Sequence, residues 1–228
     1  MAGYKFATTS DEFALLPDPH FFRGYGYSAT DKYAAEHAPD WDNRRDDIVW
    51  RGALNGTGLF SLDPKNIDNQ GVTQRLRMAL KCQTMDVDFR FVVDKGKSHR
   101  KVLQKNGLTG NYIGHLEWAN MKYAIDIDGF TNAWSNFMQR LRLGCCVLKV
   151  DSQFGFYQWY YHKLVPWEHF VPIRADLSDL QDQIDWVKSN PAKARQVAQH
   201  GQAFAKGLTF ESERQYAVET IEEREARG

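Results

Sequence analysis

Short apolar runs alternate with amphipathic segments along most of the chain. Four runs, at residues 46–50, 87–93, 122–128 and 145–150, are too short for buried helices, so they are predicted to be strands. Helix signals mark other segments of the chain. Helices are predicted at residues 28–37, 69–83, 131–141, 178–187, 190–205 and 210–227, with one helical turn at 115–121.

The segment from Lys122 to Asp151 shows this organisation most clearly, as strand, tight turn, amphipathic helix and second strand. Gly129 can take the positive φ that a sharp exit from the first strand needs, and Thr131 and Asn132 offer side-chain oxygens at a helix start. The buried face of this helix is predicted to contain Trp134, Phe137, Met138 and Leu141. The amides and positive dipole end of such a helix bind anions, typically phosphate. A phosphorylated ligand is therefore predicted, although a plain strand–helix connection has the same pattern.

A glycine-rich loop directly follows the predicted strand at residues 46–50. It contains three glycines within seven residues, which allows close backbone approach to a ligand, and its arginine can offer a bidentate fork to phosphate. The candidate binding residues in this loop are Arg51, Gly52, Asn55, Gly56 and Thr57. Neither G-x-G-x-x-G nor G-x-x-x-x-G-K-[ST] is matched. A flexible loop with a surface arginine is an equal alternative.

Strands separated by helices predict an α/β fold with a largely parallel sheet that is covered on both faces. In that architecture, ligands bind at the carboxyl ends of the strands. Both the glycine-rich loop and the Gly129 turn follow predicted strands. We therefore expect the two turns to lie at the same edge of the sheet.

Composition and charge narrow the function classes. The 228 residues carry 29 basic and 29 acidic side chains, so the net charge of zero argues against nucleic acid as a partner. Three cysteines without metal-ligand spacing indicate a reducing compartment. No apolar run approaches the roughly 18 residues of a membrane span, and the first residues do not resemble a signal peptide. A cytoplasmic location is expected.

An aromatic segment at residues 154–170 has two interpretations. Eight of its 17 residues are Phe, Tyr or Trp, which favours core packing over a sugar-stacking platform. His162 and His169 lack a third metal ligand at suitable spacing, so structural roles are favoured for both and no metal site is predicted. The spacings do not indicate a Ser-His-Asp or Cys-His arrangement.

Several longer motifs occur in a specific order. They are WRG at residues 50–52, KYAIDIDGFTNAWSNFMQRL from residue 122, VLKVDS from residue 147, FYQWYYHKLVPWEHFVPIRADLSDL from residue 156, and HGQAFA from residue 200. This order resembles glycosyltransferase family 90, which includes fungal capsule-associated proteins, animal protein O-glucosyltransferases and bacterial lipopolysaccharide-modifying sugar transferases. The upstream PDPHFFRGYGY is similar to the segment that precedes WRG in bacterial members. The resemblance covers roughly residues 16–205.

The resemblance implies the C-terminal, Rossmann-like half of a GT-B-like glycosyltransferase. The reaction would be transfer from a UDP-sugar to an acceptor hydroxyl, without a metal or other cofactor. The acceptor would be a glycan or lipid-linked glycan such as lipopolysaccharide or capsule, with peripheral contact at the inner face of the membrane. The implied donor-binding residues are Arg51, Gly52, Asn55, Gly56, Thr57, Arg75, His115, Gly129, Thr131, Asn132 and Ser135.

Two positions depart from the animal members of this family. The animal members carry an arginine about seven residues after the WRG glycine, where this chain has Leu59. They carry a second arginine near the position where this chain has Ser135. Arg75 or Arg77 on the next predicted helix is a possible substitute for the first. Neutralisation of the donor phosphates is therefore expected to be weaker or differently arranged.

The resemblance also implies a division of the chain into three parts. Residues 1–45 would be a connecting segment left from the acceptor half, residues 46–208 the nucleotide-sugar-binding domain, and residues 209–228 a terminal helix. Family members usually have an N-terminal half with a catalytic aspartate, and neither Asp11 nor Asp18 matches its motif, so no catalytic residue is assigned. Three alternatives follow: the donor-binding portion of a transferase, a minimal enzyme with a relocated base, or a nucleotide-sugar-binding module without activity.

Overall fold

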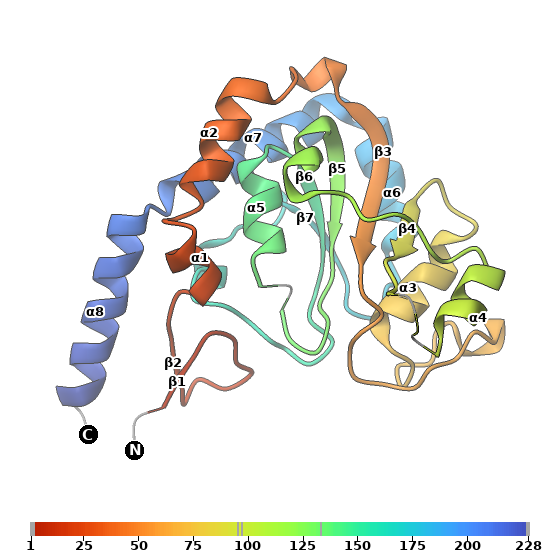
Figure 1. Cartoon of the computed structure of the whole chain (residues 1–228), viewed down its shortest axis with the longest axis horizontal. Coiled ribbons are helices and arrows are strands. Elements are labelled where there is room, and N and C mark those ends of the chain that lie inside the picture. Colours follow the sequence, from red (N-terminus) through yellow and green to blue (C-terminus); the bar gives the residue numbers. More distant parts are fainter. Residues whose placement is uncertain (1–2, 95, 97, 133, 227–228) are drawn as a thin grey trace.

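A five-stranded parallel sheet forms the centre of the molecule (Figure 1). The computed structural model describes residues 3–94, 96, 98–132 and 134–226. The strand order is β4 (Asp88–Phe91), β3 (Arg45–Gly52), β5 (Met121–Asp126), β6 (Cys146–Val150) and β7 (Val171–Ile173). Each neighbouring pair is parallel. The prediction of an α/β, Rossmann-like fold is confirmed.

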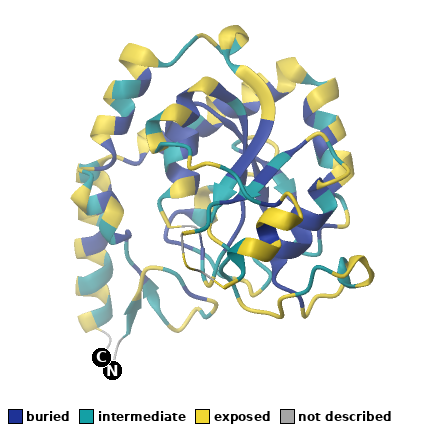
Figure 2. Cartoon of the chain, turned by 45° about the vertical axis from the view of Figure 1, so that its right-hand side comes forward, coloured by how far each residue is buried: buried dark blue, intermediate teal, exposed yellow. Residues whose placement is uncertain are grey.

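The side chains of the sheet divide between two cores, because successive residues of a strand point to opposite faces. On β3, Ile48 and Trp50 belong to one hydrophobic cluster and Val49 to the other. On β5, Ile125 packs in the first cluster and Ala124 in the second. Both faces of the strands are therefore buried, as Figure 2 shows for the dark blue ribbons at the centre.

Helices cover both faces of the sheet. The first cluster receives α3 (Gln74–Cys82), α6 (Leu180–Ser189) and the first half of α7 (Pro191–Gly207). The second receives α2 (Ser28–His37), η3 (His115–Asn120), α5 (Asn136–Arg142) and the end of α7. The remaining short helices are η1 (Trp41–Asn43), η2 (Pro64–Asn66), α4 (Arg100–Lys105) and η4 (Tyr161–Lys163).

The two ends of the chain pack beside each other (Figure 1). They contribute β1 (Tyr4–Lys5), β2 (Ala14–Leu15), α1 (Pro19–Arg23) and α8 (Phe210–Ala226). The Tyr4 hydroxyl donates to the Ile221 carbonyl, and Tyr216 donates to Leu15. Trp159 anchors α8 by donating to the buried Glu213 at 2.7 Å. The predicted helix at 210–227 is present, with Arg227 outside the described residues, while the three-part division of the chain stays a prediction.

Most predicted elements are present, but three of their starts differ. α3 begins at Gln74 instead of residue 69, because Asn69 accepts from the Gly71 amide and holds a turn there. α6 begins at Leu180 without a capping box, since the Ser178 hydroxyl donates to Asp176. α5 begins at Asn136, several residues after the predicted start at Thr131. α7 does begin at Pro191.

The strand order places a topological switch point between β3 and β5. From β3 the chain moves outward to β4, and from β5 it moves the other way to β6 and β7. The loops that leave β3 and β5 therefore run to opposite sides and leave a crevice between them, which is where ligands bind in open α/β sheets.

Candidate functional site

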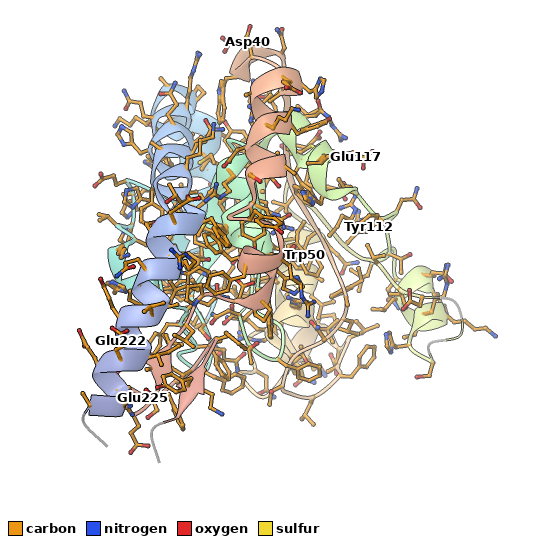
Figure 3. The ribbon with its side chains drawn as sticks, turned by 60° about the vertical axis from the view of Figure 1, so that its left-hand side comes forward. Asp40, Trp50, Tyr112, Glu117, Glu222 and Glu225 are labelled. Atoms are coloured by element: carbon orange, nitrogen blue, oxygen red, sulfur yellow. The ribbon has the colours of Figure 1, made fainter. Side chains whose placement is uncertain are left out.

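A cleft lies at the carboxyl ends of β3 and β5, at this switch point. It consists of two adjoining cavities of about 320 and about 330 Å³. We call them the Tyr112 cavity and the Thr131 cavity, respectively, after one lining residue of each. Figure 3 shows Tyr112 at the surface of the molecule. Both are lined by Arg51, Gly52, Ala53, Asn136 and Arg140. Each cavity is as large as a typical small-molecule site.

Nine of the eleven predicted binding residues line this cleft, although they come from four separate segments. The Thr131 cavity is lined by Arg51, Gly52, Asn55, Arg75, Gly129, Thr131, Asn132 and Ser135. His115 lines the Tyr112 cavity. Gly56 and Thr57 lie instead beside a much smaller cavity of about 10 Å³, next to the Thr131 cavity. The segments meet because each leads into or out of a strand of the same sheet.

The Arg51 guanidinium, predicted to be available to a phosphate, is mostly hydrogen-bonded within the protein. Its Nη2 donates to the Asp88 carboxylate at 2.5 Å, and Nη1 donates to the carbonyls of Trp50 and Asp88. Nε donates to the Asn111 carbonyl at 3.1 Å. Four of the five N–H groups of a guanidinium are thus used within the protein. Arg51 fixes the loop around Asn111 against β3 and β4, which forms the wall of the Tyr112 cavity.

Arg75 joins the loops that follow β3 and β5. Its Nη1 donates to Ala53 and Asn55, while Nε and Nη2 donate to the carbonyls of Asp128 and Ile127 at 2.8 and 2.9 Å. Burial lowers the pKa of Arg75 to about 10, against the opposing charges of Asp126 and Asp128. The side chain therefore stays protonated at neutral pH. Arg75 holds the two loops at a fixed separation across the cleft.

The Gly129 turn reaches the cleft differently from the sequence prediction. Gly129 is absent from the residues with positive φ, and its small size is needed because a Cβ would lie 2.6 Å from the Asn55 Oδ1. Thr131 and Asn132 do not cap a helix, since α5 starts only at Asn136. The Asn132 Nδ2 instead donates to Asp128 and to the Phe156 carbonyl. The loop before α5 and the start of the helix, from its cap residue Ser135, thus line the Thr131 cavity together.

The predicted buried stripe of α5 is only partly confirmed. Phe137, Met138 and Leu141 are buried in the second cluster. Trp134 precedes the helix, is 41% exposed and lines the Thr131 cavity. Because the helix begins later than predicted, the helical spacing does not extend to Trp134.

His115 connects the cleft to α2. Its Nε2 lies 3.2 Å from the Thr30 hydroxyl, within hydrogen-bonding distance. Burial lowers the pKa of His115, so the imidazole is neutral at pH 7. The wall of the Tyr112 cavity is therefore braced by a segment upstream of β3.

Sequence reasoning missed Arg140, which lines both cavities. Its side chain is 5% exposed and lies on α5, with Nη1 donating to the Ile125 carbonyl at 2.6 Å. The fully buried Asp126 lies 3.7 Å from Arg140 and 3.2 Å from the Lys149 ammonium. Arg140 lies on the helix predicted at residues 131–141, directly after the predicted phosphate-binding turn, and that position was the available signal.

The core packing favoured for the aromatic segment at 154–170 is confirmed in part, since Phe154 and Trp167 are exposed. Trp159, Tyr160 and Phe170 are buried. His169 accepts from the Val165 amide and stacks on Phe204, which gives it a structural role. Within residues 3–226, leaving out 95, 97 and 133, no group of three His, Cys, Asp or Glu side chains could hold a metal ion.

The sequence of the chain matches the profile of a known protein family. The profile of glycosyl transferase family 90 matches residues 30–224, which include both cavities. The chain belongs to glycosyl transferase family 90. The sequence resemblance is thereby confirmed. None of the described helices is long and apolar enough to cross a membrane.

Relatives in viruses and animals share parts of this family 90 chain. Uncharacterized protein 035R of invertebrate iridescent virus 3 is 28% identical over 75% of the chain. Uncharacterized protein 179R of invertebrate iridescent virus 6 and human protein O-glucosyltransferase 3 are both 37% identical, over 39% and 42% of the chain. The alignments cover 16%, 8% and 18% of these proteins. The chain thus spans less than a fifth of the length of these relatives.

The two departures from animal family 90 members fall at different places. Leu59 is 67% exposed and lines neither cavity, whereas Ser135 lines the Thr131 cavity. Of the two arginines considered as substitutes, Arg75 lines the Thr131 cavity. Arg77 is buried and donates toward Asp176 and Val72, and it lines neither cavity. Of these two arginines, Arg75 is therefore the one at the cleft.

Proposed function

We propose that this family 90 chain binds a UDP-sugar in the cleft and takes part in transfer of the sugar to an acceptor hydroxyl. The observation that carries the proposal is the convergence of nine predicted donor-binding residues at the switch point between β3 and β5. Several relatives are named protein O-glucosyltransferase, so UDP-glucose is the first donor to test.

The shape of the cleft supports an extended ligand with two chemically different ends. The Tyr112 cavity is bounded by Tyr112, Ile113 and Trp118, which offer apolar and aromatic surface to a planar base. The Thr131 cavity offers the hydroxyls of Thr131 and Ser135 to the sugar or phosphates. In this proposal, uracil occupies the Tyr112 cavity and the diphosphate crosses into the Thr131 cavity.

Transfer places negative charge on the departing diphosphate. Groups held rigidly before the reaction stabilise such charge without the cost of reorganisation. The loops after β3 and β5 are held by Arg51 and Arg75, so their polar groups are preorganised around the cleft. We propose that the protein's own side chains neutralise the leaving group, with no added cofactor.

The acceptor is proposed to be a hydroxyl of a glycan, such as lipopolysaccharide or capsule. The names of the relatives O-glucosyltransferase 1 and 3 make a protein hydroxyl the second acceptor class to test. The remaining alternative is a nucleotide-sugar-binding module without transfer activity. Release of UDP from UDP-glucose, measured with glycan and protein acceptors, separates these possibilities, because a binding-only module would release none above the uncatalysed rate.

Arg51→Ala is expected to weaken UDP binding at least tenfold, because the loop around Asn111 loses its anchor on β3 and the side chain leaves both cavities. Isothermal titration of the wild-type and variant proteins with UDP and UDP-glucose measures this. Arg195→Ala is the matched control, since Arg195 forms an exposed ion pair with Asp42 and lines neither cavity. Folded wild-type protein that binds neither ligand would contradict the proposed function, and equal binding by both variants would contradict the site.

A further inference from the structure

The three arginines that line the cleft differ in how much of their hydrogen-bonding capacity the protein uses. Arg51 directs four hydrogen bonds to protein acceptors, and Arg75 directs four. Among the described residues, Arg140 directs one, to the Ile125 carbonyl. A guanidinium has five N–H groups. Arg51 and Arg75 therefore hold loops together, whereas Arg140 has donors left for a ligand.

The position of Arg140 suits a ligand that spans the whole cleft. It lines the Tyr112 cavity and the Thr131 cavity, as do Arg51, Gly52, Ala53 and Asn136. The side chain is 5% exposed and borders both cavities, and within the described part of the chain its Nε and Nη2 donate no hydrogen bond. The diphosphate of a nucleotide sugar lies between the base and the sugar, at the junction of the two proposed subsites.

The guanidinium is held in place before any ligand binds. Its Cζ lies 4.3 Å from the centre of the Trp118 ring, and Nη1 is fixed by the Ile125 carbonyl. Asp126 lies 3.7 Å away but is shared with Lys149. The buried cluster holds three cations, Arg75, Arg140 and Lys149, and two carboxylates, Asp126 and Asp128, which leaves one positive charge in excess beside the cleft. Burial lowers the pKa of Arg140 and the Asp126 charge opposes this, so the side chain remains a cation.

We infer that Arg140 is the phosphate-binding arginine of this chain, and that Asp126 and Lys149 position it. This inference rests on the proposed function and goes beyond it, since a guanidinium at this place replaces the charge missing at Leu59 and Ser135. Arg140 contacts the diphosphate with its free Nε and Nη2 edge. Asp126 and Lys149 act through Arg140 and do not touch the ligand.

The test compares UDP with uridine, which lacks the phosphates. Arg140→Gln is expected to lower the affinity for UDP about 10- to 100-fold, the usual worth of a hydrogen bond to a charged group, and to change the affinity for uridine less than about threefold. Arg140→Lys keeps the charge but loses the planar fork, so its UDP affinity is expected to lie between that of the wild type and that of the Arg140→Gln variant. Isothermal titration measures both ligands.

Arg142→Gln is the matched control, because Arg142 lies on the same helix, is buried and binds Asp31 and the Leu208 carbonyl away from the cleft. Its ratio of UDP to uridine affinity is expected to equal that of the wild type. The inference is overturned if Arg140→Gln leaves the ratio of UDP to uridine affinity unchanged, which includes the case in which both affinities fall by the same factor. A wild-type protein that binds neither ligand would instead sink the proposed function itself.

Discussion

Replacing Gly201 with alanine is expected to lower the free energy of unfolding by about 3 kcal/mol, at the upper end for overpacked cores. Gly201 is buried on α7, where the helix crosses the end of α5. A Cβ there would lie closer to the His169 carbonyl oxygen than van der Waals contact allows, and 2.9 Å from the Leu141 Cδ2. The carbonyl belongs to the backbone leading into β7, so relief requires the helix to move.

Gly207→Ala provides the control for this prediction. Gly207 ends the same helix, and a Cβ would meet nothing within 4 Å. Its substitution is expected to be neutral or to stabilise by up to about 1 kcal/mol, because alanine restricts the unfolded chain. Urea unfolding followed by circular dichroism measures both variants. Equal stability of the two proteins would show that α7 does not pack on the His169 carbonyl as described.

Asp126→Asn is expected to destabilise the protein by about 3 to 5 kcal/mol, the cost of breaking a buried ion pair. The carboxylate is fully buried between Arg140 and Lys149, so the neutral amide would remove the charge beside Arg140 and leave Lys149 with the charge of Asp128 alone. Burial alone would lower the pKa of Lys149, but Asp126 and Asp128 raise it above its ordinary value. The lysine is therefore charged in the native protein, and its partner matters.

The origin of this effect can be separated from a loss of packing by a second substitution. Adding Lys149→Met to Asp126→Asn is expected to restore part of the lost stability, because one buried cation is removed together with its partner. Asp46→Asn is the surface control: Asp46 is 73% exposed beside Lys122, and its loss should cost less than about 1 kcal/mol. Chemical denaturation of the wild type, both single variants and the double variant gives the coupling energy. Additive effects of the Asp126 and Lys149 substitutions would contradict the charge explanation.

The sheet could be predicted because apolar residues gather in short runs, such as Ile48–Trp50 in β3, or alternate with polar ones, as in β4. The centre of β3 and most of β5 are buried on both faces, so these strands lack the alternation of a half-exposed strand and are recognised by the shortness of their apolar runs. β7 could not be found in this way, since it has three residues, includes Pro172 and directly follows the aromatic segment. The start of α5 was wrong because Thr131 and Asn132 resemble helix caps in isolation, whereas the contacts of Asn132 with Asp128 and Phe156 decide its conformation.

The members of the site could be predicted better than their bonding. Residues after a strand end must lie at the same edge of a parallel sheet, which brought Arg51 and Gly129 together. The sequence does not show that Asp88, on the neighbouring strand, takes up the Arg51 guanidinium. Nor does it show that Arg140, within an amphipathic helix, faces the cleft with unused donors. Those facts depend on which distant side chains become neighbours after folding.

The strand order also has a consequence for how the chain folds. β3 pairs with β4, which follows it closely, but its other neighbour is β5, with Ile48 opposite Tyr123. During synthesis β3 therefore emerges long before β5, and long-range parallel pairing is slow. Until then β3 exposes an unpaired edge with apolar side chains on both faces, which favours aggregation. A nascent chain that ends before residue 121 is accordingly expected to benefit from chaperone protection.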